Sequence, residues 1–325
     1  MNIILCITPL QVLIAEQIIK QTQGDFIGLY LPYGDNAKHR NYFKKLKNSC
    51  QKTEYIELKN QTWQARFATL NKIKTCLKNL NVYQKKINNI YLASIDVIFL
   101  QYIISKINFN QLYTFDDGTA NIFPNSTYFN PLQKSFAQQT FKKLIGIKYP
   151  DIPSILAVSQ KHYTIFPNEK NIIENIEPIF LFKNLKKTNN KTLSIKRILL
   201  GQALDNFIGE NAYREIVVNM KQKFAIDSFV PHPRENLDFS DILTVIHSEK
   251  IIEDYLIDEL TANLTMQYEI YTFISTAVFS LRQLPNVAIF MVYNQQLMEQ
   301  FSNAYQFLAS RDFTLLNLDK SEQKS

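Results

Sequence analysis

The stretch NIILCITPLQVLIAEQIIK, residues 2–20, decides the fold of this chain. It begins with a short apolar run, Asn2 to Ile7, which Thr8-Pro9 closes. From Leu10 to Ile19, apolar residues recur at helical spacing. A buried strand followed directly by a helix is the first half of a βαβ unit. Because this order recurs along the chain, the sequence predicts parallel sheets flanked by helices.

Further strands are predicted where apolar runs end at turn residues. They cover Phe26–Leu31, Tyr55–Leu58, Asn89–Leu92 and Leu112–Phe115, and later Arg197–Leu200, Ser228–Pro231, Tyr268–Phe273 and Val287–Val292. Helices are predicted over Glu210–Gln222, Ile251–Leu260 and Ser275–Leu281. The polar, basic stretch that begins at Lys183 lacks periodicity, which is typical of a linker. We therefore expect an α/β fold with two Rossmann-like domains, residues 1–182 and 196–325, joined by a linker at 183–195.

Composition indicates a soluble globular protein, with 46% hydrophobic and 20% charged residues. The net charge of +7 suits an acidic substrate or peripheral contact with an anionic membrane. The basic residues form scattered pairs without zinc-finger spacing, so no nucleic acid is expected as a partner. Cys6, Cys50 and Cys76 lie far apart, which favours a reducing compartment. Because no apolar run is long enough to cross a bilayer, we expect a cytoplasmic protein, at most peripheral at the inner membrane.

Asp116-Asp117-Gly118 follows the predicted strand Leu112–Phe115. One of these carboxylates could orient or deprotonate a hydroxyl group of a sugar. The same residues also suit an Asx turn in which Gly118 takes a positive φ. The spacing alone leaves both interpretations open.

Gly201-Gln-Ala-Leu-Asp205 and Pro231-His232-Pro233-Arg234 also follow predicted strands. Asp205 suits a helix N-cap, which is the favoured interpretation from the local pattern. His232 stands between two prolines, which hold it in a stiff backbone outside any helix. An imidazolium there could stabilise a phosphate leaving group. The remaining histidines are expected at the surface or in the core: His39, His162 and His247.

Ser275-Thr276 stands at the predicted start of a helix, where hydroxyls and backbone N–H groups bind phosphate well. A plain N-cap is the alternative. Glu253 could bind ribose hydroxyls, although acidic residues are also common in the first turn of a helix. The chain contains no G-x-G-x-x-G, no P-loop and no isolated Asp-x-Asp. We therefore expect neither a metal nor another cofactor.

Together these segments resemble the bacterial sialyltransferases of glycosyltransferase family 52, the lipooligosaccharide α-2,3-sialyltransferases. The similar stretches, in the family's order, are Tyr91–Ser94, Thr114–Asn121, His162–Phe166, Arg197–Gly201, Pro231–Arg234, Ile252–Tyr255 and Tyr268–Phe273. The resemblance implies the two-domain GT-B architecture, with an acceptor-side N-terminal domain and a C-terminal domain that binds the CMP-sugar. It also implies inverting, metal-independent transfer of sialic acid (N-acetylneuraminic acid) from CMP-sialic acid to a terminal galactose of lipooligosaccharide or a related surface glycan.

By position, the resemblance implies that Asp205 is the catalytic base and His232 the acid. The loop between Gly201 and Asp205 differs in length from the family's usual form, so Asp116 and Asp117 remain alternative bases. The residues expected to bind substrate are Gly201, Pro231, Pro233, Arg234, Glu253, Ser275, Thr276, Asp116, Asp117 and Gly118. Another nucleotide sugar, or a non-catalytic glycan-binding role on this scaffold, is the alternative function. A homodimer is compatible with the sequence.

Overall fold

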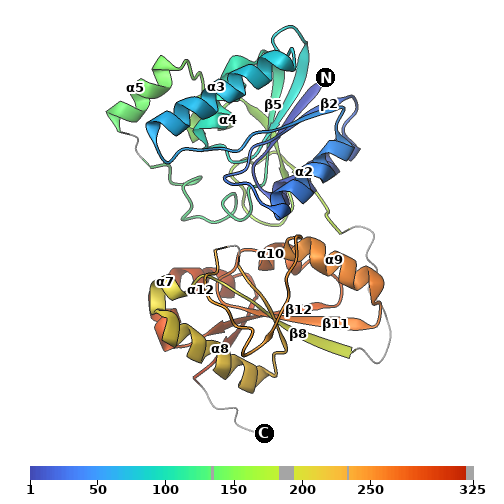
Figure 1. Cartoon of the computed structure of the whole chain (residues 1–325), viewed down its shortest axis with the longest axis vertical. Coiled ribbons are helices and arrows are strands. Elements are labelled where there is room, and N and C mark those ends of the chain that lie inside the picture. The colour runs from blue at the N-terminus through green and yellow to red at the C-terminus, as the bar shows by residue number, and fades with distance from the viewer. Residues whose placement is uncertain (133–134, 183–193, 233, 320–325) are drawn as a thin grey trace. The chain divides into compact units, whose positions relative to one another are not determined.

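The computed structural model describes residues 1–132, 135–182, 194–232 and 234–319. The chain divides into two compact units, Met1–Leu181 and Phe182–Ser325. Each unit contains one parallel sheet with helices connecting its strands (Figure 1). Most of the predicted linker, residues 183–193, lies outside the described residues. Ser194 and Ile195, its last two residues, instead begin a strand.

The first unit contains a seven-stranded sheet in the order β3-β2-β1-β4-β5-β6-β7. Its strands are β1 (Asn2–Cys6), β2 (Phe26–Tyr30), β3 (Lys52–Tyr55), β4 (Ile87–Leu92), β5 (Phe109–Phe115), β6 (Ser159–Thr164) and β7 (Ile176–Pro178). Its helices are α1 (Pro9–Gln21), α2 (Ala37–Ser49), α3 (Trp63–Asn79), α4 (Ile98–Lys106), α5 (Phe136–Leu144) and α6 (Ile152–Leu156). Both β1 and β2 are buried throughout, which explains their continuous apolar sequences.

Strand residues of this sheet point alternately to its two faces. Ile3 and Leu29 belong to the apolar core that also contains Ile73 of α3 and Phe99 of α4. On β2, a Cβ at Gly28 would meet Leu46 of α2 at 3.0 Å. The sheet is therefore covered on both faces.

The second unit contains a six-stranded sheet in the order β10-β9-β8-β11-β12-β13. Its strands are β8 (Ser194–Leu200), β9 (Ser228–Val230), β10 (Thr244–Val245), β11 (Met266–Thr272), β12 (Val287–Tyr293) and β13 (Thr314–Asn317). Its helices are α7 (Asp205–Ile208), α8 (Glu210–Phe224), α9 (Ile252–Ala262), α10 (Val278–Leu281), α11 (Gln295–Gln300) and α12 (Ser302–Ala309).

Alternation along β8 divides the apolar core of this unit between two faces. Leu199 packs in a cluster with Val217 of α8, whereas Ile198 packs in a cluster with Leu256 of α9. Figure 1 shows α8 and α9 on either side of β8 and β11. Alternate residues of β8 point to opposite faces of the sheet, and the apolar faces of α8 and α9 each cover one of these faces.

Each sheet has one point at which successive connections lead to opposite sides. In the first unit this point lies between β1 and β4, and in the second between β8 and β11. Open parallel sheets bind ligands outside the carboxyl ends of the strands at such a point. The chain leaves these ends at Ile7 and Ala93 in the first unit, and at Gly201 and Phe273 in the second.

The strands β6, β7, β10 and β13 were not predicted from the sequence. Among the predicted elements, two differ most from the expectation. β3 covers Lys52–Tyr55 rather than 55–58, because this polar segment is the edge strand beside β2. The helix expected over 275–281 is only α10, Val278–Leu281. Among the described residues, no helix is both long and apolar enough to cross a membrane.

Candidate functional site

The loops that follow β8, β9 and β11 carry most of the predicted site residues. These three strands are neighbours in the sheet, in the order β9-β8-β11. Because the strands are parallel, their following loops emerge at the same edge of the sheet. The second unit therefore brings the loops of Asp205, His232 and Ser275 to one edge.

Gly201 begins the loop after β8 and is buried. Its N–H donates to the carbonyl of Val230, with an N–O distance of 2.9 Å. A Cβ at this position would lie 2.6 Å from Cζ of Phe229, so no larger residue fits without displacing the ring. Gly201 thus joins the ends of β8 and β9 closely, and this packing explains the glycine without any ligand.

Asp205 is the first residue of the short helix α7 and is half-buried. The N-cap position is occupied by Leu204, and no side-chain hydrogen bond caps this helix. The N-cap interpretation of Asp205 is therefore wrong. Its Oδ1 accepts a bond from Nδ2 of Asn206 at 3.2 Å. The Asp205 carboxylate is thus available for a role other than capping.

His232 follows β9 and is half-buried. Its Nδ1 accepts the N–H of Arg234 at 3.1 Å, and its carbonyl accepts the N–H of Glu235 at 2.8 Å. Because Nδ1 accepts, we infer that the neutral ring carries its proton on Nε2. Pro231 is half-buried and the Arg234 side chain is exposed. Pro233 lies outside the described residues.

Ser275 and Thr276 precede helix α10 without starting it. The helix begins at Val278 and has four residues, so the predicted helix start at Ser275 is wrong. The hydroxyl of Ser275 accepts the N–H of Ala277 at 3.4 Å, a local bond that competes with helix formation. Any phosphate contact here would come from hydroxyls and turn N–H groups rather than from a helix dipole.

Glu253 lies in the first turn of α9, as the sequence suggested. Its side chain is buried, and its Oε1 accepts the hydroxyl of Ser280 at 2.7 Å. This bond joins α9 to α10, and therefore gives Glu253 a structural partner. Contact with ribose hydroxyls remains a prediction.

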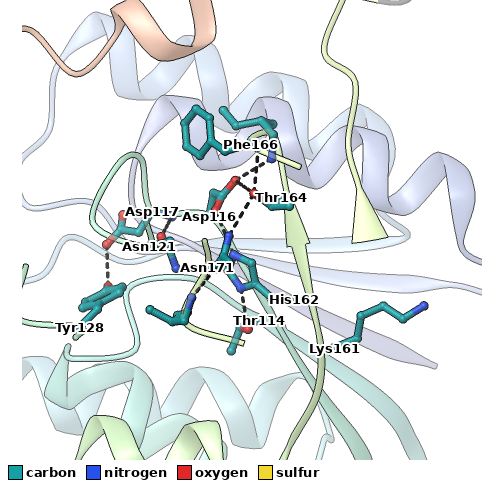
Figure 2. Close-up of polar contacts among 12 residues, drawn as sticks. Thr114, Asp116, Asp117, Asn121, Tyr128, Lys161, His162, Thr164, Phe166 and Asn171 are labelled. Carbon is teal, nitrogen blue, oxygen red and sulfur yellow. Dashed lines mark hydrogen bonds and ion pairs between the residues drawn. The ribbon is translucent and has the colours of Figure 1, made fainter. Parts of the chain in front are cut away.

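Asp116 and Asp117 follow β5 in the first unit, and their settings differ. The Asp116 side chain is fully buried. It accepts bonds from Nε2 of His162 at 2.9 Å, from the hydroxyl of Thr164 at 2.8 Å and from the N–H of Ile165 at 2.6 Å (Figure 2). His162 is equally buried, and its Nδ1 contacts the Thr114 hydroxyl at 2.8 Å. Asp116 thus ties β5 to β6, and of the two positions expected for His162, the surface or the core, the structure shows the core.

Asp117 lies where the loops after β1, β4 and β5 meet. Its Oδ1 accepts a bond from Nε2 of Gln11. Its Oδ2 accepts the hydroxyl of Tyr128 at 2.9 Å (Figure 2). Gln11 also donates to the hydroxyl of Ser94 at 2.8 Å. Gly118 has φ +75°, as expected for this turn. Together these groups form a polar cluster at the strand-order reversal of the first sheet.

Burial raises the pKa of the Asp117 carboxyl to about 6, and the nearby charge of Asp96 adds to this effect. Hydrogen bonds from Ser94, Tyr128 and Gln11 lower the pKa and partly offset the burial. A carboxyl group with a pKa close to neutral can accept a proton efficiently in a reaction near neutral pH. Asp117 is therefore the better base candidate of the Asp116–Asp117 pair.

Asp117→Asn should stabilise the protein relative to wild type as the pH rises. The raised pKa means that ionising Asp117 in the folded protein costs stability, with no penalty below the ordinary value of 3.8 and the full penalty above about 6. The free energy of unfolding should shift in favour of the variant by up to about 3 kcal/mol between about pH 4 and pH 8. Urea denaturation at both pH values measures this shift. The exposed carboxylate variant Asp25→Asn is the control, and equal shifts in both variants would contradict the prediction.

Several residues around these sites were not predicted from the sequence. Gln11 has a local signal, because Thr8 and Gln11 form a capping box at the start of α1. Tyr128 has none, since its contact with Asp117 depends on the path of the loop after β5. Glu235 also lacks a motif, although it follows Arg234 directly and contacts Tyr213 of α8 at 3.2 Å.

Among the described residues, no three His, Cys, Asp or Glu side chains are grouped so that they could hold a metal ion. Cys6 is a buried core residue, and the three cysteines are free thiols. His39 contacts the Tyr30 hydroxyl at 2.7 Å, and His247 is exposed.

Comparison with solved structures identifies the architecture. The glycotransferase of kitacinnamycin is similar with a TM-score of 0.51 at 8% identity, over 98% of this chain and 86% of that one. The glycosyltransferase SnogD from Streptomyces nogalater also has a TM-score of 0.51, at 11% identity, over 99% of this chain and 88% of that one. At such low identity the likeness concerns the fold alone, which is GT-B, as expected.

Comparison with known sequences identifies the family. The model of glycosyltransferase family 52 matches residues 24–296. A CMP-N-acetylneuraminate:beta-galactoside alpha-2,3-sialyltransferase of Pasteurella multocida is 34% identical, over 86% of this chain and 87% of that protein. Two N-acetyllactosaminide alpha-2,3-sialyltransferases are also similar. The one from Haemophilus influenzae is 34% identical, over 89% of this chain and 91% of that protein. The one from Neisseria meningitidis is 30% identical, over 92% of this chain and 80% of that protein. The chain therefore belongs to glycosyltransferase family 52 and is a glycosyltransferase.

Proposed function

We propose that this enzyme transfers N-acetylneuraminic acid from CMP-N-acetylneuraminic acid to a terminal galactose, forming an α-2,3 linkage. The observation that carries this proposal is the near full-length match to three relatives named as alpha-2,3-sialyltransferases. The acceptor is a galactose at the end of lipooligosaccharide or a related surface glycan. The residues up to 182 bind this acceptor, and those from 196 onward bind the donor. We place the reaction in the cytoplasm, with peripheral contact at the inner membrane.

The proposed chemistry is a single displacement that inverts the anomeric centre. Asp205 accepts the proton of the galactose hydroxyl, and the hydroxyl oxygen bonds to the anomeric carbon of the sialic acid. The bond between that carbon and the phosphate oxygen breaks, and CMP leaves with the electron pair. His232 stabilises the charge on the departing phosphate. Ser275 and Thr276 add hydroxyl donors to the same phosphate.

Asp205 is the proposed base because it follows β8, beside the strand whose end carries His232. Asp117 is the alternative base, favoured by its pKa of about 6. Asp116 is a weaker candidate, since its carboxylate is fully buried and accepts three hydrogen bonds. Asp117 and Gly118 are otherwise assigned to the acceptor.

One assay tests the proposed activity. CMP release from CMP-N-acetylneuraminic acid is measured with and without a β-galactoside, and the product linkage is determined by NMR. We expect release that depends on the acceptor, and an α-2,3 product. Turnover with a UDP- or GDP-sugar instead would identify a transferase with a different donor. Binding of a β-galactoside without turnover of any nucleotide sugar would indicate a glycan-binding protein.

Activity should persist in EDTA. A CMP-linked donor carries one phosphate. One imidazolium and a few hydroxyl donors are enough to stabilise the charge of a single phosphate without a metal ion. We expect the initial rate in excess EDTA to equal the rate without it. Loss of activity that Mg²⁺ or Mn²⁺ restores would contradict this mechanism for the leaving group.

A further inference from the structure

A chain of hydrogen bonds joins the three strand-end loops of the second unit. The hydroxyl of Tyr213 donates to Oε2 of Glu235 at 3.2 Å, and the same hydroxyl accepts the N–H of Gln202 at 3.3 Å. Oε1 of Gln202 accepts the N–H of Ile274 at 2.6 Å. The chain therefore runs from the loop of His232, through helix α8, to the loop of Asp205 and on to the loop of Ser275. At one end of this chain of hydrogen bonds lies the carboxylate of Glu235, which has no role in the proposed mechanism.

Glu235 lies close to the backbone where the loop of Asp205 begins. A Cβ at Gly201 would lie 3.2 Å from Oε2 of Glu235, so the carboxylate borders the space that a side chain at this position would occupy. Its Oε1 is buried and has no hydrogen-bond partner among the described residues. A buried carboxylate oxygen without a partner is unfavourable for stability, and a functional role is one reason for such a group to be retained.

We propose that Glu235 is a positioning residue, which acts through Tyr213 and Gln202 to hold the loop of Asp205 in the geometry that the transfer reaction needs. This inference rests on the proposed function, because it takes Asp205, His232 and Ser275 as parts of one reactive site. A base works in the transition state only when its oxygen is correctly placed. Loss of the anchor should therefore lower kcat and leave the KM of the donor nearly unchanged.

The anchor depends on the ionisation of Glu235. Burial raises its pKa to about 7, and the charge of Asp205 on α7 adds to this rise. The hydroxyl of Tyr213 on α8 and the N–H of Leu237 lower the pKa and partly offset the rise. On the same loop, Arg234 is charged and exposed, and His232 is the other titratable side chain. Above about pH 7 the ionised carboxylate accepts a stronger bond from Tyr213 than the protonated acid does, so the loop is held more firmly.

The experiment compares Glu235→Gln and Tyr213→Phe with wild type. The amide that Glu235→Gln introduces keeps an oxygen that can accept from Tyr213 but does not ionise, whereas Tyr213→Phe removes both hydrogen bonds of the hydroxyl. Glu215→Gln is the matched control, because Glu215 is exposed on the same helix as Tyr213. The readouts are kcat and donor KM across the pH range, together with amide hydrogen exchange at Gln202 and Ile274. Both variants are assayed well below their melting temperatures.

We expect Glu235→Gln to lower kcat about tenfold above pH 7, with little change below pH 6, because a bond to a charged acceptor becomes a neutral one. Tyr213→Phe should lower kcat at least about tenfold at every pH, and it should speed hydrogen exchange at the N–H of Gln202. Glu215→Gln should match wild type throughout.

Wild-type pH profiles in Glu235→Gln, or unchanged exchange at Gln202 in Tyr213→Phe, would overturn the positioning role. An equal loss of kcat by Glu235→Gln at all pH values would also do so, since it would show that ionisation is irrelevant. Failure of the proposed function looks different. The wild type would then not turn over CMP-N-acetylneuraminic acid, whereas hydrogen exchange at Gln202 and Ile274 would still show whether Tyr213 joins the loops.

Discussion

His232→Ala is expected to lower kcat for sialyl transfer by about 10²–10⁴-fold, the usual contribution of a residue that assists by acid–base chemistry. The substitution removes the imidazole that stabilises the departing phosphate. The fold should persist, because the ring is only half-buried and the bond of the His232 carbonyl to the N–H of Glu235 does not involve the side chain. Steady-state kinetics and circular dichroism of the purified variant measure both effects.

His247→Ala is the control for this substitution, since His247 is exposed and lies in the loop after β10. It should retain wild-type turnover. A folded His232→Ala protein with near-normal turnover would show that His232 does not act on the leaving group, and a different donor to the phosphate would then be required.

Asp205→Asn is expected to lower kcat and kcat/KM together by about 10²–10⁴-fold, with little change in donor KM. The amide cannot accept the proton of the attacking hydroxyl, while its size and its place at the start of α7 are retained. Asp117→Asn should mainly raise the KM of the acceptor. Asp116→Asn should mainly lower stability, because its carboxylate is buried against His162, Thr164 and Ile165.

Initial rates measured over both substrate concentrations separate these outcomes. The roles of Asp205 and Asp117 are reversed if Asp117→Asn abolishes kcat in a stable protein while Asp205→Asn keeps most of its activity. In that case the pKa of about 6 at Asp117 would be the property that makes it the base.

Much of the fold could be predicted from the sequence, because buried parallel strands require continuous apolar runs. β1, β2 and β8 all lie within or beside the runs that predicted them. The errors occur where local pattern is overruled by context. β3 is an edge strand with a polar sequence, and its position depends on pairing with β2. Helix α10 is shorter than expected, because Ser275 bonds to the backbone of Ala277 before the helix begins.

Less of the candidate site could be predicted from the sequence. Turn chemistry identified Asp116 and Asp117 as a pair, but only the tertiary structure separates the buried Asp116 from Asp117 with its raised pKa. The local sequence at Asp205 suits an N-cap. In the structure, however, α7 begins at Asp205 itself, so the N-cap position belongs to Leu204. Glu235 could not be predicted, since its neighbours Tyr213 and Gly201 come from other parts of the chain.

The raised pKa of Asp117 also bears on how this enzyme would respond to laboratory evolution. A population of random variants challenged by heat at neutral pH would be enriched in those that lose this buried charge, because each such change relieves an electrostatic strain in the folded state. Variants that survive the heat challenge would unfold more slowly, but they would have a higher KM for the acceptor. Screens for heat tolerance should therefore retain aspartate at this position by design, and seek their gains elsewhere in the chain.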